Sequence, residues 1–213
     1  AKQSHPTVLV NPGQGVTVFG LQLLDNKDEF ENQRSKRRGT LTFQSRPQDV
    51  LSLFGAPDSI FPKAKDLLQI HRRQHKGQNR HPNYRDYFYN FFELGIDILF
   101  DGQSQKIKKI ILHTNLPTHP TFNQYSKCFY NIVPPNAQNA DAEGPPVYVT
   151  PDMKWDKVTQ VFGPAGQPFV SPGADDNPFG GSHYYAYKDI IFEVMDNDMY
   201  TANITLFNSE FYR

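Results

Sequence analysis

Apolar and polar residues alternate in many short runs of this chain, and this alternation predicts β-strands. In "GIDILFDG" it places Ile96, Ile98 and Phe100 on one face of a strand, and the Asp-Gly pair that follows favours a hairpin turn before "KIKKIILH". Further strands are predicted at "TVLV", "VTVFGLQLL", "TLTF", "SIF", "KCFYNIV", "VYV", "PFV", "HYYAY", "DIIFEVMD" and "TANITLFN".

Two segments have helical spacing instead. In "SRPQDVLSLFGAP" the apolar residues fall on one helical face, Ser45 is the expected N-cap and Pro47 fits the first turn. Gly55 is expected to end this helix. In "TPDMKWDKVTQVFGP", Thr150 is the expected N-cap and Pro151 the first helical residue.

The two helices and the hairpins that follow them recur in the same order, which predicts an internal repeat. Each half reads strand, helix, Gly, strand, loop, two strands, turn and strand. The corresponding positions are Val50 and Val158, Phe54 and Phe162, Gly55 and Gly163, Ile96 and Ile190, Ile110 and Ile204, and Leu112 and Leu206. The alternative is that two unrelated α+β stretches share this order by chance.

The repeat predicts a mostly β, α+β fold of two tandem helix-on-antiparallel-sheet modules, joined edge to edge or face to face. Its pattern resembles the small modules of β-lactamase inhibitor proteins and bacterial outer-membrane assembly lipoproteins, which bind proteins. The expected divisions are N-terminal strands and a charged loop at 1–38, a first module at 39–133, a linker at 134–146 and a second module at 147–213.

Composition restricts the function classes. The 22 basic and 22 acidic residues balance, so no overall field favours nucleic acid or a membrane surface as a partner. The single cysteine, Cys128, cannot form an internal disulfide and favours a reducing compartment. No run approaches the ~20 apolar residues of a membrane span. The chain lacks both a secretory apolar region and an initiator Met, so we expect a fragment of a longer cytoplasmic protein.

Candidate chemistry is sparse. The seven histidines show no tight ligand pair, although His113 and His119 are close in sequence and three more lie within 71–81. Cys128 is either a packed core thiol or, beside an unseen base, a nucleophile. The carboxylates Asp97, Asp101, Glu193, Asp196 and Asp198 could supply acid–base pairs, but three of them fall at turns. We therefore expect no cofactor, no metal and no catalytic residues.

Two segments stand out as candidate contact surfaces. A basic insertion suits phosphates of lipid headgroups or phosphoproteins, and its alternative role is a solvated, solubilising loop. Its candidate contacts are Lys63, Lys65, Arg72, Arg73, Lys76, Arg80 and Arg85. The aromatic segment "NPFGGSHYYAY" is a partner surface if exposed and core if buried. Its candidates are Phe179, Tyr184, Tyr185 and Tyr187.

Several stretches together resemble the phagophore assembly factor family of eukaryotes. They are "RPQDVLSLFGAPDSIF", "DYFYNFFELGIDILFDGQSQKIKKIILHTNLPTH", "YSKCFYNI", "KWDKVTQVFG" and "NPFGGSHYYAYKDIIFEVM". They follow the family's order over about residues 40–207, and they are similar to its C-terminal half. The match is poor over 1–38, and length and charge depart from the family around 71–81 and 134–146.

The resemblance implies a non-enzymatic autophagy factor that is recruited to the phagophore. It also implies a complex with a WD-repeat propeller protein of the breast carcinoma amplified sequence type, to which phosphoinositide binding is mainly attributed. The family supplies no catalytic residues. Two alternatives stay open: a hydrolase whose site gathers His113, Asp97 or Cys128 in a cleft, and a lipid or small-ligand module with an apolar cavity.

Overall fold

The computed structural model describes residues 5–21, 37–63, 84–135, 147–171 and 180–209. Within them, twelve strands form two sheets and two short helices complete the fold. The four-stranded sheet has the order β3-β2-β1-β8, with β1 Thr7–Asn11, β2 Gly15–Leu21, β3 Arg37–Thr42 and β8 Phe129–Ile132. The mostly β, α+β class predicted from the sequence is confirmed.

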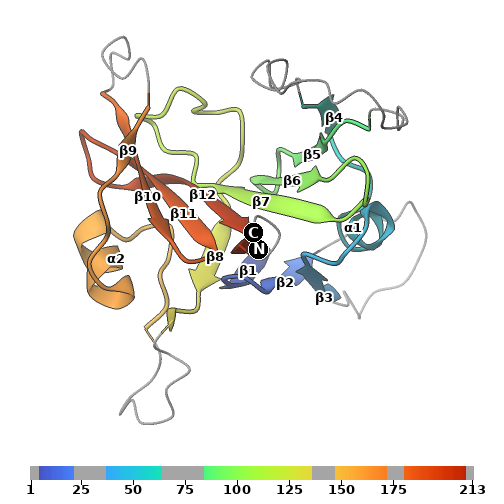
Figure 1. Cartoon of the computed structure of the whole chain (residues 1–213), viewed down its shortest axis with the longest axis horizontal. Coiled ribbons are helices and arrows are strands. Elements are labelled where there is room, and N and C mark those ends of the chain that lie inside the picture. Colours follow the sequence, from blue (N-terminus) through green and yellow to red (C-terminus); the bar gives the residue numbers. More distant parts are fainter. Residues whose placement is uncertain (1–4, 22–36, 64–83, 136–146, 172–179, 210–213) are drawn as a thin grey trace, which may run out of the picture.

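The eight-stranded sheet contains the last four strands of each copy of the repeat. Its order is β4-β5-β6-β7-β12-β11-β10-β9, so the second copy runs through the sheet in the reverse direction (Figure 1). The strands are β4 Ser59–Pro62, β5 Tyr87–Phe91, β6 Ile96–Phe100, β7 Ile107–His113, β9 Phe169–Val170, β10 Ser182–Tyr187, β11 Ile190–Met195 and β12 Thr201–Phe207. The copies meet where β7 pairs with β12, so of the two predicted arrangements the edge-to-edge one is present.

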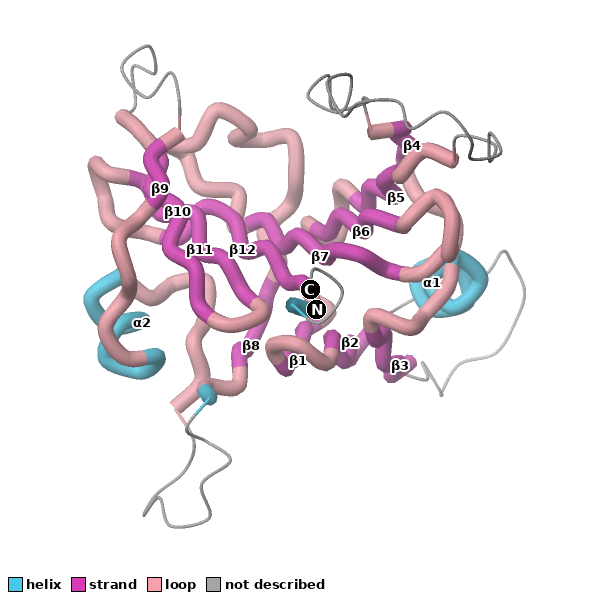
Figure 2. The backbone as a smooth tube through the Cα atoms, viewed as in Figure 1, coloured by secondary structure: helices cyan, strands magenta, loops and turns pink. Residues whose placement is uncertain are grey.

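One hydrophobic core lies on the inner face of the long sheet. Helix α1 (Pro47–Phe54) and helix α2 (Trp155–Phe162) lie near its two ends, and the four-stranded sheet lies between them (Figure 2). Val10 of β1, Val50 of α1 and Val158 of α2 are all buried with inner-face residues such as Ile98 and Ile204. The loop 114–128 crosses the opposite, outer face. None of the helices in the described ranges is long and apolar enough to span a membrane.

The N-terminus of α1 differs by one residue from the sequence prediction. Its N-cap is Arg46, whose N–H donates to Asp49 Oδ2 at 2.7 Å. Ser45 is instead used in the preceding turn, where its Oγ accepts from Thr42 N at 3.0 Å and its carbonyl accepts from Ile107 N at 3.1 Å. The predicted place of Pro47 in the first turn and the predicted end of the helix at Gly55 are confirmed; Gly55 has a φ of 83°, which favours glycine.

Helix α2 begins four residues later than predicted. Thr150 and Pro151 form a turn, and the helix starts at Trp155 with Lys154 as its N-cap. The cause is a long-range restraint: Lys154 forms a β-bridge with Tyr200, and Trp155 N donates to the Met199 carbonyl at 2.8 Å. An extended backbone at Lys154 is incompatible with a helix that starts before it.

Candidate functional site

A buried polar cluster lies on the outer face of the long sheet, beneath the loop 114–128. Asp97 Oδ2 accepts hydrogen bonds from His113 Nε2 and from Tyr125 OH, each at 2.9 Å, and Oδ1 accepts from Asn90 Nδ2 at 2.8 Å. The sheet register places Asn90 opposite Asp97, and the loop brings in Tyr125, whose ring stacks on His113 with centroids 3.7 Å apart. A carboxylate with three donors is well satisfied in a buried site.

A second carboxylate, Glu193, forms a similar cluster nearby. It accepts from Tyr184 OH at 2.8 Å, from Asn203 Nδ2 at 2.7 Å and from His119 Nε2 at 3.2 Å. Burial opposes ionisation of Glu193. The hydrogen bonds from His119, Asn203 and Tyr184 and the charge of His119 nevertheless lower its pKa to about 2. His119 belongs to the loop, so Asp97 and Glu193 together hold this loop against the sheet at two points.

The Asp97–His113 pair lacks the third member of a nucleophilic site. Nδ1 of His113 is buried and has no hydrogen-bond partner among the described residues. Cys128 is close in the fold, since its N–H donates to the His113 carbonyl at 2.8 Å. However, burial raises the pKa of the Cys128 thiol to about 12, which disfavours the thiolate. The geometry of Asp97 and His113 therefore favours a structural role, in which they hold the loop 114–128 on the sheet, over covalent catalysis.

The remaining carboxylates act on backbone groups or single side chains. Asp101 Oδ2 accepts from Ser104 N at 2.7 Å, and Asp198 Oδ1 accepts from Tyr200 N at 3.1 Å, as expected for turns. Asp196 pairs with His183. No group of three or more His, Cys, Asp or Glu in the described ranges is arranged to hold a metal ion, and His71, His75 and His81 lie outside those ranges.

The tyrosines of the predicted partner surface lie on β10 and alternate between the two faces of the sheet. Tyr185 stacks on Trp155 of α2 with centroids 4.5 Å apart, and Tyr187 OH donates to the Gly163 carbonyl at 2.8 Å. Tyr184 faces the other way and binds Glu193. All three are partly exposed, and Phe179 lies outside the described residues. Their contact with a partner stays a prediction.

Only the two ends of the predicted basic segment lie within the described residues. Lys63 and Arg85 are exposed there, whereas Lys65, Arg72, Arg73, Lys76 and Arg80 fall outside. The role of the whole segment stays a prediction.

Beside these ends the fold adds two lysines that the sequence did not single out, Lys108 and Lys109 of β7. Asp86 joins Lys108 to Lys63: its carbonyl accepts from Lys63 N at 2.8 Å, and its Oδ2 lies 2.9 Å from Lys108 Nζ. Burial, followed by the nearby charges of Lys63 and Lys108, lowers the pKa of Lys109. These lysines are far from the basic segment in sequence, and only the pairing of β4, β5, β6 and β7 brings them near it.

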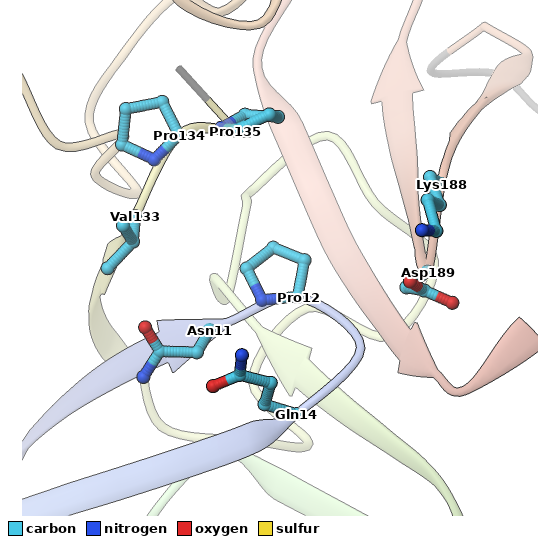
Figure 3. Close-up of a pocket in the computed structure, with 8 residues that line it drawn as sticks. All are labelled: Asn11, Pro12, Gln14, Val133, Pro134, Pro135, Lys188 and Asp189. Carbon is cyan, nitrogen blue, oxygen red and sulfur yellow. The ribbon is translucent and has the colours of Figure 1, made fainter. Parts of the chain in front are cut away.

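A small pocket lies where the two sheets meet (Figure 3). It has a volume of about 250 Å³ and lies between the β1–β2 turn, the end of β8 and the β10–β11 turn. Its lining residues are Asn11, Pro12, Gln14, Val133, Pro134, Pro135, Lys188 and Asp189. The volume is below the usual range for ligand sites, about 300–1,000 Å³.

Comparison with known proteins gives one family. The family model described as "Phagosome assembly factor 1" matches residues 3–207. A PHAF1 protein of Arabidopsis thaliana is 40% identical over 173 residues, which cover 79% of this chain and 41% of the relative. A PHAF1 protein of Drosophila melanogaster is 36% identical over 189 residues, covering 79% and 41%.

A PHAF1 protein of Caenorhabditis elegans is 33% identical over 169 residues, with 78% of this chain and 37% of the relative covered. The chain thus spans about two-fifths of the length of these relatives. No solved structure matches.

Proposed function

Because the chain belongs to the phagosome assembly factor 1 family, we propose that it is a non-enzymatic scaffold or adaptor module that acts where autophagosomes form. The observation that carries this proposal is the family match over residues 3–207. The buried clusters of Asp97 and Glu193 agree with it, because they stabilise a loop and include no activated nucleophile among the described residues.

The proposed partner is a WD-repeat propeller protein of the breast carcinoma amplified sequence type. The family resemblance of the sequence is the basis for this partner. A rigid eight-stranded sheet with one internal core is a suitable scaffold, because its surface residues are held in fixed positions for a partner to recognise. Tyr184, Tyr185, Tyr187 and Phe179 are the proposed contact residues.

The proposed site of action is a phosphoinositide membrane to which a cytoplasmic protein is recruited. The basic segment from Lys63 to Arg85 would contact lipid phosphates there, because clusters of Lys and Arg bind anionic headgroups. Lys63 and Arg85 are both exposed, which supports this role.

Affinity purification of the tagged chain from cells that express the propeller protein tests the partner. We expect the propeller to co-purify at near-stoichiometric amounts and to be depleted by a Tyr184→Ala/Tyr185→Ala variant whose fold is intact by circular dichroism. An exposed control, Lys157→Ala on α2, should retain the partner. If clean purifications recover no propeller protein, the proposal that the chain is an adaptor is wrong.

A further inference from the structure

The two end strands of the long sheet, β4 and β9, occupy corresponding places in the repeat, and both expose large apolar side chains. Ile60 and Phe61 of β4 are each 59% exposed, and Phe169 and Val170 of β9 are 63% and 47% exposed. Exposed apolar residues on an edge strand favour aggregation. Where a protein keeps them, they often mark a surface that binds a protein or a membrane.

The sequences that directly follow the two edge strands differ in the sign of their charge. In the sequence, β4 is followed by Lys63 and Lys65, whereas β9 is followed by Asp175 and Asp176. At the β4 end, Arg85 is exposed as well, next to Tyr84, which is 62% exposed. Apolar and cationic groups therefore lie together at the β4 edge. The β9 edge also exposes apolar groups, but its neighbours in the sequence are anionic.

The surface at the β4 edge continues across the outer face of the sheet toward β7. The register aligns Phe61 with Phe88, Phe88 with Leu99 and Leu99 with Lys109, so one row crosses four strands. Among the described residues Lys109 forms no ion pair: Asp86, whose charge acts on Lys109, is paired with Lys108 Nζ at 2.9 Å. A cation held near other lysines without its own carboxylate is stabilised when an anion binds.

We propose that the β4 edge is a docking surface for an anionic membrane. Ile60, Phe61 and Tyr84 enter the interface between headgroups and acyl chains, and Lys63, Arg85 and Lys109 contact the lipid phosphates. This inference rests on the proposed role at a membrane, and it names an apolar part of the contact that the basic segment alone does not supply.

Strand addition by a protein partner fits this edge less well. Pro62 ends β4 and lacks an N–H to donate, and Pro57 precedes the strand. Flanking lysines and prolines are features with which proteins block pairing at a sheet edge. A membrane needs no such pairing, and aromatic and aliphatic side chains beside Lys and Arg are suited to its interface.

Sedimentation of the purified chain with vesicles tests the surface. The vesicles contain one part phosphatidylserine to four parts phosphatidylcholine, with pure phosphatidylcholine for comparison. We expect an Ile60→Ser/Phe61→Ser variant to lose about tenfold or more in partition coefficient. Lys63→Gln and Lys109→Gln should each lose about fivefold, and added salt should reduce these two effects.

The other edge of the sheet supplies the matched control. Phe169→Ser/Val170→Ser removes equally apolar side chains from the β9 edge and should leave binding unchanged. All variants change exposed or partly exposed residues, and thermal melting verifies their folding. Equal losses from the two edge variants, or no preference of the chain for anionic vesicles, would overturn the docking surface.

Purification of the propeller partner with the same variants separates the two proposals. If the β4 variant loses the propeller while its vesicle binding is normal, the edge is a protein contact and the membrane assignment is wrong. If the wild-type chain binds vesicles through this edge but recovers no propeller, the docking surface stands and the adaptor proposal falls.

Discussion

Ile111 and Thr205 lie directly opposite each other in the centre of the eight-stranded sheet, where β7 pairs with β12. They are also corresponding residues of the repeat, because Ile110 and Leu112 correspond to Ile204 and Leu206. The same seam pairs Ile110 with Leu206 and Leu112 with Ile204. An approximate two-fold axis therefore passes between Ile111 and Thr205, and the two hairpins contribute equivalent residues to one core.

This symmetry predicts that equivalent truncations have similar costs. Ile110→Ala and Ile204→Ala each remove a fully buried side chain and should each reduce the free energy of unfolding by about 2–5 kcal/mol. Urea denaturation measures both. Ile111→Ala, on the partly exposed outer face, should cost less. A large cost for one buried site and almost none for its equivalent would show that the halves do not share a core.

Local signals in the sequence were enough to predict the hairpins and the C-terminal ends of the two helices. The Asp-Gly turn and the alternation around Ile98 depend only on neighbouring residues, as does the glycine that ends each helix. The four-stranded sheet could not be predicted in this way. It pairs Thr7 in parallel with Phe129, a contact between residues more than a hundred positions apart that leaves no local pattern.

The same limit applies to the site. Asp97, His113 and Cys128 were identified as candidates, but only the structure shows that Asp97 binds His113 and that Tyr125 completes the cluster. Lys109 was missed because its neighbours come from strands distant in sequence. Chemistry that depends on such pairings becomes visible only when the register is known.

The Asp97 cluster predicts a strong dependence of stability on this carboxylate. Asp97→Ala leaves the donors of His113, Tyr125 and Asn90 without their acceptor and should cost about 2–4 kcal/mol in the free energy of unfolding. Urea denaturation measures this cost.

A matched control for Asp97 is Asp152→Ala, which removes an exposed carboxylate that pairs with Lys127. This change should cost less than about 1 kcal/mol. Comparable stabilities of the two variants would contradict the role of Asp97 as an anchor for the loop 114–128.

Burial of Cys128 predicts that its thiol is unreactive in the native chain. Its pKa of about 12 keeps it protonated at neutral pH, and the side chain is only 2% exposed. An aromatic disulfide reagent should therefore label the folded protein very slowly and label it fully in concentrated urea. Rapid labelling of the folded chain would instead indicate an accessible thiolate and would support Cys128 as a nucleophile.

Glu193 predicts how acid destabilises the protein. Its pKa in the folded chain is about 2, below the ordinary value of 4.5. A carboxyl group whose pKa is depressed on folding stabilises the folded state fully above its unfolded pKa. This contribution is then lost as the pH falls from about 4.5 through about 2, because His119, Asn203 and Tyr184 no longer face an ionised carboxylate.

Glu193→Gln should therefore make the free energy of unfolding depend less on pH in the acid range. The variant should be less stable at neutral pH by on the order of 3 kcal/mol, and the difference from wild type should shrink as the pH falls toward 2. Urea denaturation across this pH range measures both curves. The exposed Glu93→Gln serves as the control and should follow the wild-type curve. A constant difference between wild type and Glu193→Gln at every pH would mean that Glu193 contributes through packing and not through its charge.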